Sequence, residues 1–337
     1  MSENILTVKD LKTYFYTASG IAKAVDGVSF NIAKGETMGI VGESGSGKSV
    51  TSSSIIRLLP PRTGKIVGGS IEFEGKDVLA LSKKELNDFR GKDIAVIFQD
   101  PMTSLDPVFK IGKQMTEMIM AHQNVTKDEA WKMAVEALSK VGIPEPEKRM
   151  NSYPYELSGG MCQRVIIAMA VCCKPKLIIA DEPTTALDVT VQAQVLELLK
   201  ELQRDMDTAI LLITHNLGVV WEMCDKVMAM YAGNTVEFTD TKTLYSNPRH
   251  PYTWGLLDSM PKLSDESKGE LKTIPGTPPD LRLTGKCCNF YNRCPYVTEA
   301  CTQSVPPLVE VEPGHFVACH RQNLTNKLEK GEGLKDE

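Results

Sequence analysis

The fold of this chain is decided by one stretch near its N-terminus, Thr37-Met38-Gly39-Ile40-Val41-Gly42-Glu43-Ser44-Gly45-Ser46-Gly47-Lys48-Ser49. Its first five residues predict a buried strand, and the residues after Ser49 predict a helix that continues through Leu59. Between them lies the pattern G-x-x-x-x-G-K-[ST], in the strand–loop–helix setting that this motif requires. Its glycines let backbone N–H groups converge on phosphate oxygens, and the helix dipole favours the same negative charge. The stretch therefore predicts a phosphate-binding loop rather than an ordinary helix-capping turn.

Two side chains of this loop have specific expected roles. The Lys48 ammonium group is long enough to reach the β- and γ-phosphates of a nucleoside triphosphate, and the Ser49 hydroxyl can ligate Mg²⁺. ATP and Mg²⁺ are therefore the expected ligands. The predicted nucleotide contacts of this segment are Gly42, Glu43, Ser44, Gly45, Ser46, Gly47, Lys48, Ser49 and Val50.

Two later strands end in side chains suited to the same chemistry. Leu177–Glu182 is a continuous apolar run that ends in two carboxylates, as in a strand buried on both faces of a parallel sheet. Asp181 can hold Mg²⁺, usually through water, and Glu182 can polarise the water that attacks the γ-phosphate. A third apolar run, Leu211–His215, ends in a histidine. Because ligands collect at the carboxyl ends of parallel strands, we expect His215 to face the same nucleotide.

A second anion-binding element precedes Asp181 in the sequence. It reads Leu157-Ser158-Gly159-Gly160-Met161-Cys162-Gln163-Arg164, ahead of a helical stretch from Val165. A serine and two glycines that open a helix can bind an anion. Two phosphate-recognition elements in one chain are explained if two chains complete each other's nucleotide sites in a head-to-tail dimer. The stretch matches the signature motif of the ATP-binding cassette (ABC) family, which this sequence resembles, although Cys162 replaces the usual arginine.

The other landmarks of that family follow in its order over about residues 5–245. Gln99 matches the Q-loop, Ala186-Leu187-Asp188 matches the D-loop, and His215 matches the switch histidine. Phe15 is the best match to the aromatic residue that stacks on adenine, with Tyr14 and Tyr16 as alternatives. The resemblance implies that Gln99 senses the γ-phosphate and helps to hold Mg²⁺. It also adds to the nucleotide site Ser158, Gly159, Gly160, Gln163 and Asp188.

The resemblance also implies the fold class. We expect an α/β chain with a P-loop NTPase (RecA-like) core, an antiparallel β subdomain, an inserted helical subdomain and a small Cys/Pro-rich metal-binding domain. The predicted ABC domain spans residues 1–245, with the helical subdomain at about 102–158. Of 19 prolines, 10 follow residue 245, and five of the nine cysteines lie between residues 287 and 319. This shift places a C-terminal domain at 246–325, followed by a charged tail at 326–337.

Four of the clustered cysteines, Cys288, Cys294, Cys301 and Cys319, show the spacing C-x5-C-x6-C-x17-C. Structural zinc sites more often use C-x2–4-C pairs, and Cys294 is followed by proline, as in some iron–sulfur proteins. From spacing alone, an iron–sulfur cluster, a zinc site and free thiols all remain open. The stretches Asn247–Thr253 and Ile274–Leu281 resemble the D-type ATPases of oligopeptide and dipeptide importers, a subgroup that includes nickel importers. That resemblance implies a [4Fe–4S] cluster held by these four cysteines, with zinc as the second candidate.

Composition limits the remaining function classes. The 337 residues carry a formal net charge of −5 and are 42% hydrophobic, which argues against binding of nucleic acid by bulk charge. No apolar run long enough to span a membrane and no secretory signal is present, so we expect a cytoplasmic protein. The resemblance implies an ATPase subunit of a peptide importer at the cytoplasmic face of the membrane. Its implied partners are a second, F-type ATPase, two transmembrane permease subunits and an extracytoplasmic peptide-binding protein.

Two rival functions come from other classes. Soluble ATPases that act as mechanical clamps in DNA repair or translation share the nucleotide motifs, but they usually carry coiled-coil or tandem-cassette insertions that this sequence lacks. A metal-dependent regulatory module without enzyme activity is disfavoured, because Lys48, Asp181, Glu182 and His215 are all present.

Overall fold

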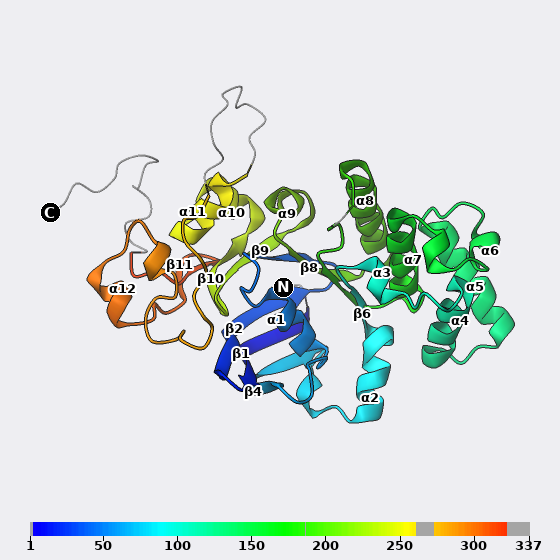
Figure 1. Ribbon diagram of the computed structural model, residues 1–337, viewed down its shortest axis with the longest axis horizontal. Coiled ribbons are helices and arrows are strands. Elements are labelled where there is room, and N and C mark those ends of the chain that lie inside the picture. Colours follow the sequence, from blue (N-terminus) through cyan, green and yellow to red (C-terminus); the bar gives the residue numbers. More distant parts are fainter. Residues whose placement is uncertain (1–2, 186, 261–272, 322–337) are drawn as a thin grey trace, which may run out of the picture. The chain divides into compact units, whose positions relative to one another are not determined.

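The computed structural model describes residues 3–185, 187–260 and 273–321 of the chain (Figure 1). These residues form two compact units, each built from separate segments of sequence. Unit 1 combines the residues up to Leu6 with Ile32–Thr37 and Phe73–Ile213. Unit 2 combines Thr7–Asn31, Met38–Glu72 and the chain from Thr214 onward. Ala186 of the predicted D-loop and the predicted tail lie outside the described residues.

Unit 1 contains three neighbouring parallel strands in the order β8-β7-β6. Ile97 is paired with Ala180 across one ladder, and Asp181 is paired with Ile213 across the other. Strand β8 consists of buried residues, and so does β7 up to its final Asp181, as expected where helices cover both faces of a parallel sheet. The strands of this unit are β5 (Lys76–Asp77), β6 (Ile94–Ile97), β7 (Leu177–Asp181) and β8 (Ala209–Thr214).

Most helices of unit 1 follow β6 in the sequence. The helices of this unit are α2 (Lys83–Asp88), α3 (Pro101–Ser104), α4 (Ile111–His122), α5 (Lys127–Lys140), α6 (Pro146–Arg149), α7 (Gly159–Val171) and α8 (Val189–Met206). Helices α4, α5 and α7 pack against one another (Figure 1). Their buried stripes include Ile119, Leu138 and Ile167. The segment predicted to be a helical subdomain, 102–158, contains α4 to α6, and its exact limits stay a prediction.

Unit 2 contains five neighbouring strands in the order β11-β12-β10-β9-β3, of which β3 and β9 are parallel. The others pair antiparallel. A second sheet has the order β2-β1-β4. The strands are β1 (Asn4–Thr17), β2 (Gly20–Ala33), β3 (Thr37–Val41), β4 (Gly64–Phe73), β9 (Lys226–Tyr231), β10 (Asn234–Asp240), β11 (Val309–Glu312) and β12 (His315–Val317). The helices are α1 (Lys48–Ile55), α9 (Leu217–Met223), α10 (Thr241–Ser246), α11 (Pro251–Asp258) and α12 (Glu299–Gln303).

Strand β3 and helix α1 confirm the predicted strand–loop–helix order, but α1 ends earlier than the sequence suggested. The helix stops at Ile55 instead of Leu59, and Arg57 adopts a left-handed φ of 53°. The N–H of Arg57 donates to the carbonyl oxygen of Ser54 at 3.0 Å, and that of Leu58 donates to the carbonyl oxygen of Ser53 at 2.7 Å. These two bonds close the last turn, as is usual where a helix ends at a left-handed residue.

The C-terminal strands surround a buried carboxylate. Glu237 on β10 is fully buried, and its oxygens accept the backbone N–H groups of Arg249 at 2.6 Å and His250 at 3.0 Å. Nε2 of His315 on β12 lies 2.8 Å from the same carboxylate. In turn, Nδ1 of His250 accepts the N–H of Tyr252 at 3.0 Å and caps α11. Because an isolated buried charge is very costly, these contacts fix the start of α11 relative to the sheet.

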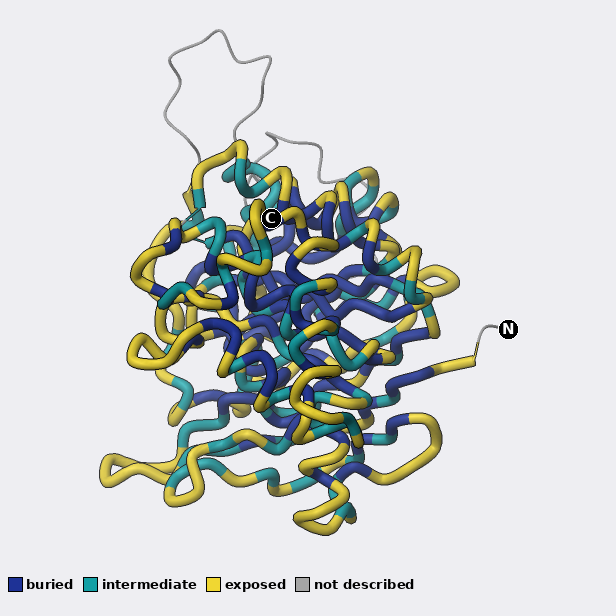
Figure 2. The backbone as a smooth tube through the Cα atoms, turned by 90° about the vertical axis from the view of Figure 1, so that its right-hand side faces the viewer, coloured by how far each residue is buried: buried dark blue, intermediate teal, exposed yellow. Residues whose placement is uncertain are grey.

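Burial follows the elements rather than the loops. In Figure 2 the buried backbone forms dark blue stretches in the interior, and the exposed yellow stretches are mostly loops and turns. Within the described ranges, no helix has both the length and the apolar character that a membrane crossing needs.

His250 gives a testable pH dependence of stability. Burial lowers the pKa of this histidine from 6.5 to about 4, although the Glu237 charge opposes the shift. Above pH 6.5 the imidazole is neutral in both the folded and the unfolded chain, so its titration does not change the free energy of unfolding there. Between pH 6.5 and 4 the unfolded chain binds a proton that the folded chain excludes, so the free energy of unfolding should fall by about 3 kcal/mol.

Urea unfolding of the wild type and of His250→Asn, measured from pH 7.5 to 4, tests this expectation. Asparagine can still cap α11 but does not titrate. The variant should lose less free energy of unfolding than the wild type over this range. Parallel pH profiles for the two proteins would show that His250 does not titrate as described.

Candidate functional site

The phosphate loop, residues Gly42–Ser49, connects β3 to α1 in unit 2. Gly42 and Gly47 have φ values of 150° and 105°. A Cβ atom added to Gly42 would lie 2.3 Å from the carbonyl oxygen of Met230, and one added to Gly47 would lie 2.3 Å from that of Ala24. Any other residue at either position would collide with backbone. These two glycines therefore allow the loop to lie directly against the neighbouring strands.

Lys48 lies across the loop that precedes it. Its ammonium group donates to the carbonyl oxygens of Gly42 at 2.7 Å and Glu43 at 3.0 Å, and only 5% of the residue is exposed. The hydroxyl of Ser46 is buried and has no hydrogen-bond partner among the described residues. A buried lysine and an unsatisfied hydroxyl within one glycine-rich loop are the polar groups that a bound phosphate can satisfy.

The strand-end carboxylates belong to unit 1. Glu182 directly follows β7 and adopts a left-handed φ of 49°, and its N–H donates to the carbonyl oxygen of Ile213 at 2.8 Å. One carboxylate oxygen accepts Nε2 of Gln99 at 3.0 Å and Oγ1 of Thr185 at 2.9 Å. The structure thus brings Gln99 and Glu182 together. Thr185 was missed because the sequence offers no motif that assigns it a role.

Two predicted site residues begin helices in unit 1. Ser158 caps α7, and its hydroxyl accepts the N–H of Met161 at 3.3 Å. Asp188 caps α8, and its carboxylate accepts the N–H of Val191 at 2.9 Å. Ser158 and Gly159 are exposed, whereas only 1% of Gln163 is exposed. The first turn of α7 therefore presents its serine and glycine to solvent, and Gln163 lies inside the unit.

The three candidate aromatics on β1 differ in what they contact. The Tyr14 hydroxyl donates to Asp26 at 2.7 Å, and burial followed by this bond raises the pKa of Tyr14 to about 12. Tyr16 is 40% exposed, with the Lys65 ammonium group 5.3 Å from its ring centre. Phe15 is half-buried beside Gly64.

The predicted switch histidine, His215, belongs to unit 2, where it follows β8 and is exposed.

Glu43 makes contacts that the motif did not predict. Its carboxylate accepts both terminal nitrogens of Arg293, at 2.5 and 2.9 Å. Its backbone N–H donates to the hydroxyl of Tyr252 at 2.8 Å. Both partners come from the C-terminal region, more than 200 positions away in the sequence. No local pattern could identify them, although Tyr252 lies within the stretch Asn247–Thr253 that carries a family resemblance.

The C-terminal cysteines do not form a recognisable metal site. In the part of the chain that the structure describes, no group of three His, Cys, Asp or Glu side chains could hold a metal ion. The N–H of Cys288 nevertheless donates to the carbonyl of Cys301 at 3.0 Å. Burial, with a smaller contribution from the neighbouring cysteines, raises the pKa of Cys288 to about 12 and that of Cys294 to about 11. The predicted metal-binding domain is therefore not confirmed.

Cysteines in apolar, helix-like surroundings are by default small buried residues, and the sequence places Cys162, Cys172, Cys173 and Cys224 in such surroundings. Cys162 and Cys224 are buried, which confirms the expectation for these two. Cys172 and Cys173, directly after α7, are only half-buried. They lie where the chain leaves the helix, so part of their surface faces solvent.

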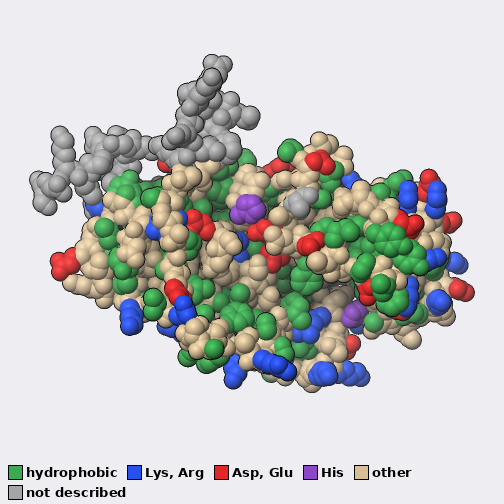
Figure 3. Space-filling view, in the orientation of Figure 1, with side chains coloured by type: hydrophobic (Ala, Val, Ile, Leu, Met, Phe, Trp, Pro, Cys, Tyr) green, Lys and Arg blue, Asp and Glu red, His purple; other side chains and the backbone are tan. Residues whose placement is uncertain are grey.

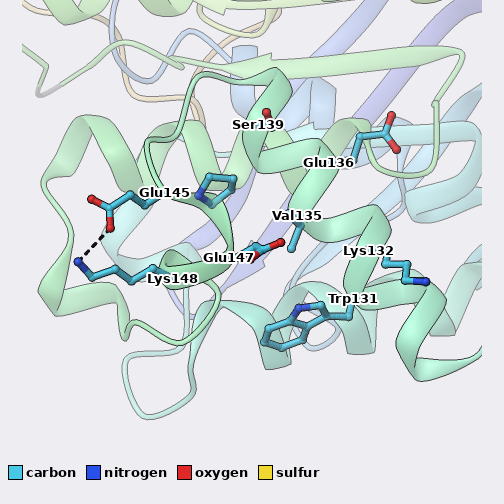
Figure 4. A pocket seen from close by; sticks show the side chains of 9 residues that line it. Trp131, Lys132, Val135, Glu136, Ser139, Glu145, Glu147 and Lys148 are labelled. Atoms are coloured by element: carbon cyan, nitrogen blue, oxygen red, sulfur yellow. Dashed lines mark ion pairs between the residues drawn. The ribbon is translucent and has the colours of Figure 1, made fainter.

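A separate pocket of about 720 Å³ lies between α5 and the turn around α6 (Figure 4). Trp131 forms one wall, and charges of both signs surround it, including the Glu145–Lys148 ion pair at 2.9 Å. None of the predicted site residues lines this pocket. This pocket therefore does not coincide with any residue predicted to bind the nucleotide.

Comparison of this chain with known proteins identifies the family to which it belongs. Residues 25–185 match the family described as "ABC transporter", and residues 236–301 match "Oligopeptide/dipeptide transporter, C-terminal region". The chain is 54% identical over 313 residues to the oligopeptide transport ATP-binding protein OppD of Bacillus subtilis, covering 93% of this chain and 87% of that protein. This chain belongs to the ABC transporter ATPases.

Other relatives of this ABC ATPase match over similar lengths. It is 51% identical to OppD of Escherichia coli, covering 95% of this chain and 94% of that protein. It is 49% identical to the dipeptide transport ATP-binding protein DppD of B. subtilis, covering 95% and 96%. The dimeric ATP-binding cassette MJ0796, solved with ADP and Pi, aligns with a TM-score of 0.63 and 27% identity, covering 70% of this chain and 98% of that one. The expected P-loop ABC ATPase fold is thereby confirmed.

Proposed function

We propose that this ABC ATPase hydrolyses ATP to drive import of dipeptides or oligopeptides across the cytoplasmic membrane. The observation that carries the proposal is the 54% identity to an oligopeptide transport ATP-binding protein over 93% of the chain. The match includes the region after residue 236, which has its own family relationship to peptide transporters. The comparisons give no support to a soluble clamp in DNA repair or translation, and we assign no nucleic-acid partner.

Within this function, the phosphate loop holds the triphosphate. Its backbone N–H groups and Lys48 neutralise phosphate oxygens, and Phe15 stacks on adenine. Lys48, already buried across the loop, would exchange its bonds to the Gly42 and Glu43 carbonyls for bonds to phosphate. The residues that would hold Mg²⁺ are Ser49, Gln99 and Asp181. When bound, this ion supplies positive charge to the β- and γ-phosphate oxygens.

Glu182 is the residue to which we assign the attacking water. Its carboxylate can accept a proton from that water, and the hydrogen bond from Gln99 holds one oxygen in a fixed orientation. His215 contacts the γ-phosphate in this account. The hydrogen bond between Gln99 and Glu182 supports a role for Gln99 in sensing the γ-phosphate, because it joins Gln99 directly to the proposed catalytic carboxylate.

A second ATPase of the F type completes the site in a head-to-tail dimer. The exposed Ser158 and Gly159 support this assignment, since they are available to the phosphates of an opposite subunit. Gly160, Gln163 and Asp188 belong to the same predicted surface. The solved relative MJ0796 is itself described as a dimer.

Two permease subunits and a peptide-binding protein form the rest of the importer, with this chain peripheral at the cytoplasmic face. Exposed apolar side chains on the segment between β6 and α4 support a docking role. They are Phe98, Met102, Val108 and Phe109, which are 40–70% exposed. Hydrophobic side chains gather on the surface near α3 and α7 (Figure 3). A membrane partner would cover such side chains.

For the C-terminal region we propose a [4Fe–4S] cluster on Cys288, Cys294, Cys301 and Cys319, with zinc as the second candidate. The donor set supports it, because four thiols from one small region are suited to either group. The side-chain positions do not yet form the site, and only Cys288 among them lines the nearby cavity of about 130 Å³. The thiols would have to turn toward one another on binding. The domain limits at residues 245 and 325 are part of the same proposal.

Glu182→Gln tests the catalytic assignment. The variant should bind ATP with wild-type affinity, because the amide keeps the shape of the side chain. It should lose turnover by about 100-fold or more, because the amide cannot accept a proton. Binding of labelled ATP and phosphate release are the measurements, and Glu197→Gln on the exposed face of α8 is the matched control. Near-normal turnover in Glu182→Gln would remove Glu182 from the mechanism.

Purification without oxygen tests the metal proposal. A [4Fe–4S] protein should be brown, with absorbance at about 400 nm and matching iron and sulfide contents. Cys294→Ser should lose the colour, whereas Cys287→Ser should keep it because Cys287 is not a proposed ligand. A colourless protein with stoichiometric zinc would reject the cluster, and a metal-free protein would reject both candidates.

A further inference from the structure

Glu43 is held from both of its ends by the C-terminal region of unit 2. The Arg293 guanidinium binds its carboxylate with two parallel bonds, and the Tyr252 hydroxyl accepts its backbone N–H. Arg293 is nearly buried, with 4% of its side chain exposed, compared with 29% for Glu43. A two-bond arginine–carboxylate pair fixes orientation as well as distance. The second residue of the phosphate loop therefore cannot rotate independently of the C-terminal region.

Arg293 is itself rigidly placed. Nε donates to the carbonyl oxygen of Pro275 at 2.8 Å, and Nη2 donates to that of Ile274 at 3.1 Å. Nη1 also lies 3.3 Å from the hydroxyl of Tyr231. Each guanidinium nitrogen thus has a partner, and the fork points at Glu43.

Tyr252 is fixed by packing. It is fully buried, and its ring lies 4.7 Å from that of Tyr231 and 5.5 Å from that of Phe290, measured between centroids. Its position on α11 depends on the His250 cap, which in turn depends on Glu237. The Tyr252 side chain is therefore already ordered, and it accepts the N–H of Glu43 without a further loss of its conformational entropy.

These contacts reach the residue that binds phosphate. The carbonyl oxygen of Glu43 is one of the two that accept the Lys48 ammonium group, at 3.0 Å. A rotation of the Glu43 peptide would move that carbonyl and change where Lys48 rests. The orientation of Glu43 is thus linked to the loop's main cationic side chain.

We propose that Arg293 and Tyr252 are positioning residues that hold the phosphate loop in its nucleotide-binding shape through Glu43. The inference rests on the proposed function, in which this loop binds ATP. The C-terminal region then sets nucleotide affinity, in addition to any metal it binds. Neither residue touches the nucleotide in this account. Their effect is to remove the cost of ordering the loop when ATP arrives.

The test compares ATP hydrolysis by the full chain, assembled with its permease partners, in Arg293→Met and Tyr252→Phe variants. Contacts that only hold the loop in shape affect the binding of ATP equally in the ground state and in the transition state. Loss of these contacts should therefore raise KM and leave kcat unchanged. We expect about a tenfold higher KM for Arg293→Met, which loses a charge-assisted pair. Tyr252→Phe, which loses one oxygen and keeps its packing, should show a smaller increase.

Two further variants separate positioning from general stability. Arg293→Lys keeps the charge but loses the fork, so it should restore only part of the affinity. Arg282→Met removes an arginine that pairs with Asp280 on the exposed surface of the same region and should leave KM unchanged. A fall in kcat with unchanged KM in Arg293→Met would mean that Arg293 only keeps the chain folded.

The same experiment distinguishes failure of the inference from failure of the proposed function. Lys48→Ala, measured by labelled ATP binding in parallel, should lose affinity if the phosphate loop binds ATP. If Lys48→Ala loses ATP binding while Arg293→Met and Tyr252→Phe keep wild-type KM values, the positioning role of Arg293 and Tyr252 is wrong and the proposed function stands. If Lys48→Ala binds ATP normally, the function assigned to the loop is wrong.

Discussion

The structure depends on one backbone constraint: a short loop must turn from β3 into α1 while it lies directly against the neighbouring strands. Gly42 and Gly47 make the turn at φ values of 150° and 105°, where a side chain would collide with the backbone of β9 and β2. Because the loop lies so close to its neighbours, its shape is set by them. A bound phosphate would engage Lys48, which now donates to two loop carbonyls, and the Ser46 hydroxyl, which has no hydrogen-bond partner in the part of the chain that the structure describes.

The C-terminal region extends this constraint instead of forming an independent appendage. The Glu237 carboxylate holds the start of α11, α11 carries Tyr252, and Tyr252 meets the loop at Glu43. Arg293 approaches the same glutamate beside Cys294, one of the proposed cluster ligands. The second family match, over residues 236–301, covers both contacts. The part of the chain that matches the peptide-transporter C-terminal region therefore includes both residues that we propose to hold the phosphate loop.

The sequence predicted those features that local chemistry determines. The loop, its two flanking elements and the buried strand before Asp181 follow from short patterns of glycine, lysine and apolar residues. The end of α1 does not follow from such a pattern, because the helix stops where Arg57 adopts a left-handed conformation. The contacts of Glu43 could not be predicted, since Tyr252 and Arg293 reach it through tertiary packing over more than 200 positions. The bond between Gln99 and Glu182 likewise requires the pairing of β6 with β7.

Transport in a reconstituted system would show whether ATP hydrolysis by this chain drives peptide import. The chain would be reconstituted in lipid vesicles with its second ATPase and two permease subunits, and peptide-loaded binding protein would be added on the opposite side. We expect labelled peptide to accumulate only when hydrolysable ATP is present on the side of this chain. Vigorous ATP hydrolysis by the assembled complex without any peptide accumulation would contradict it.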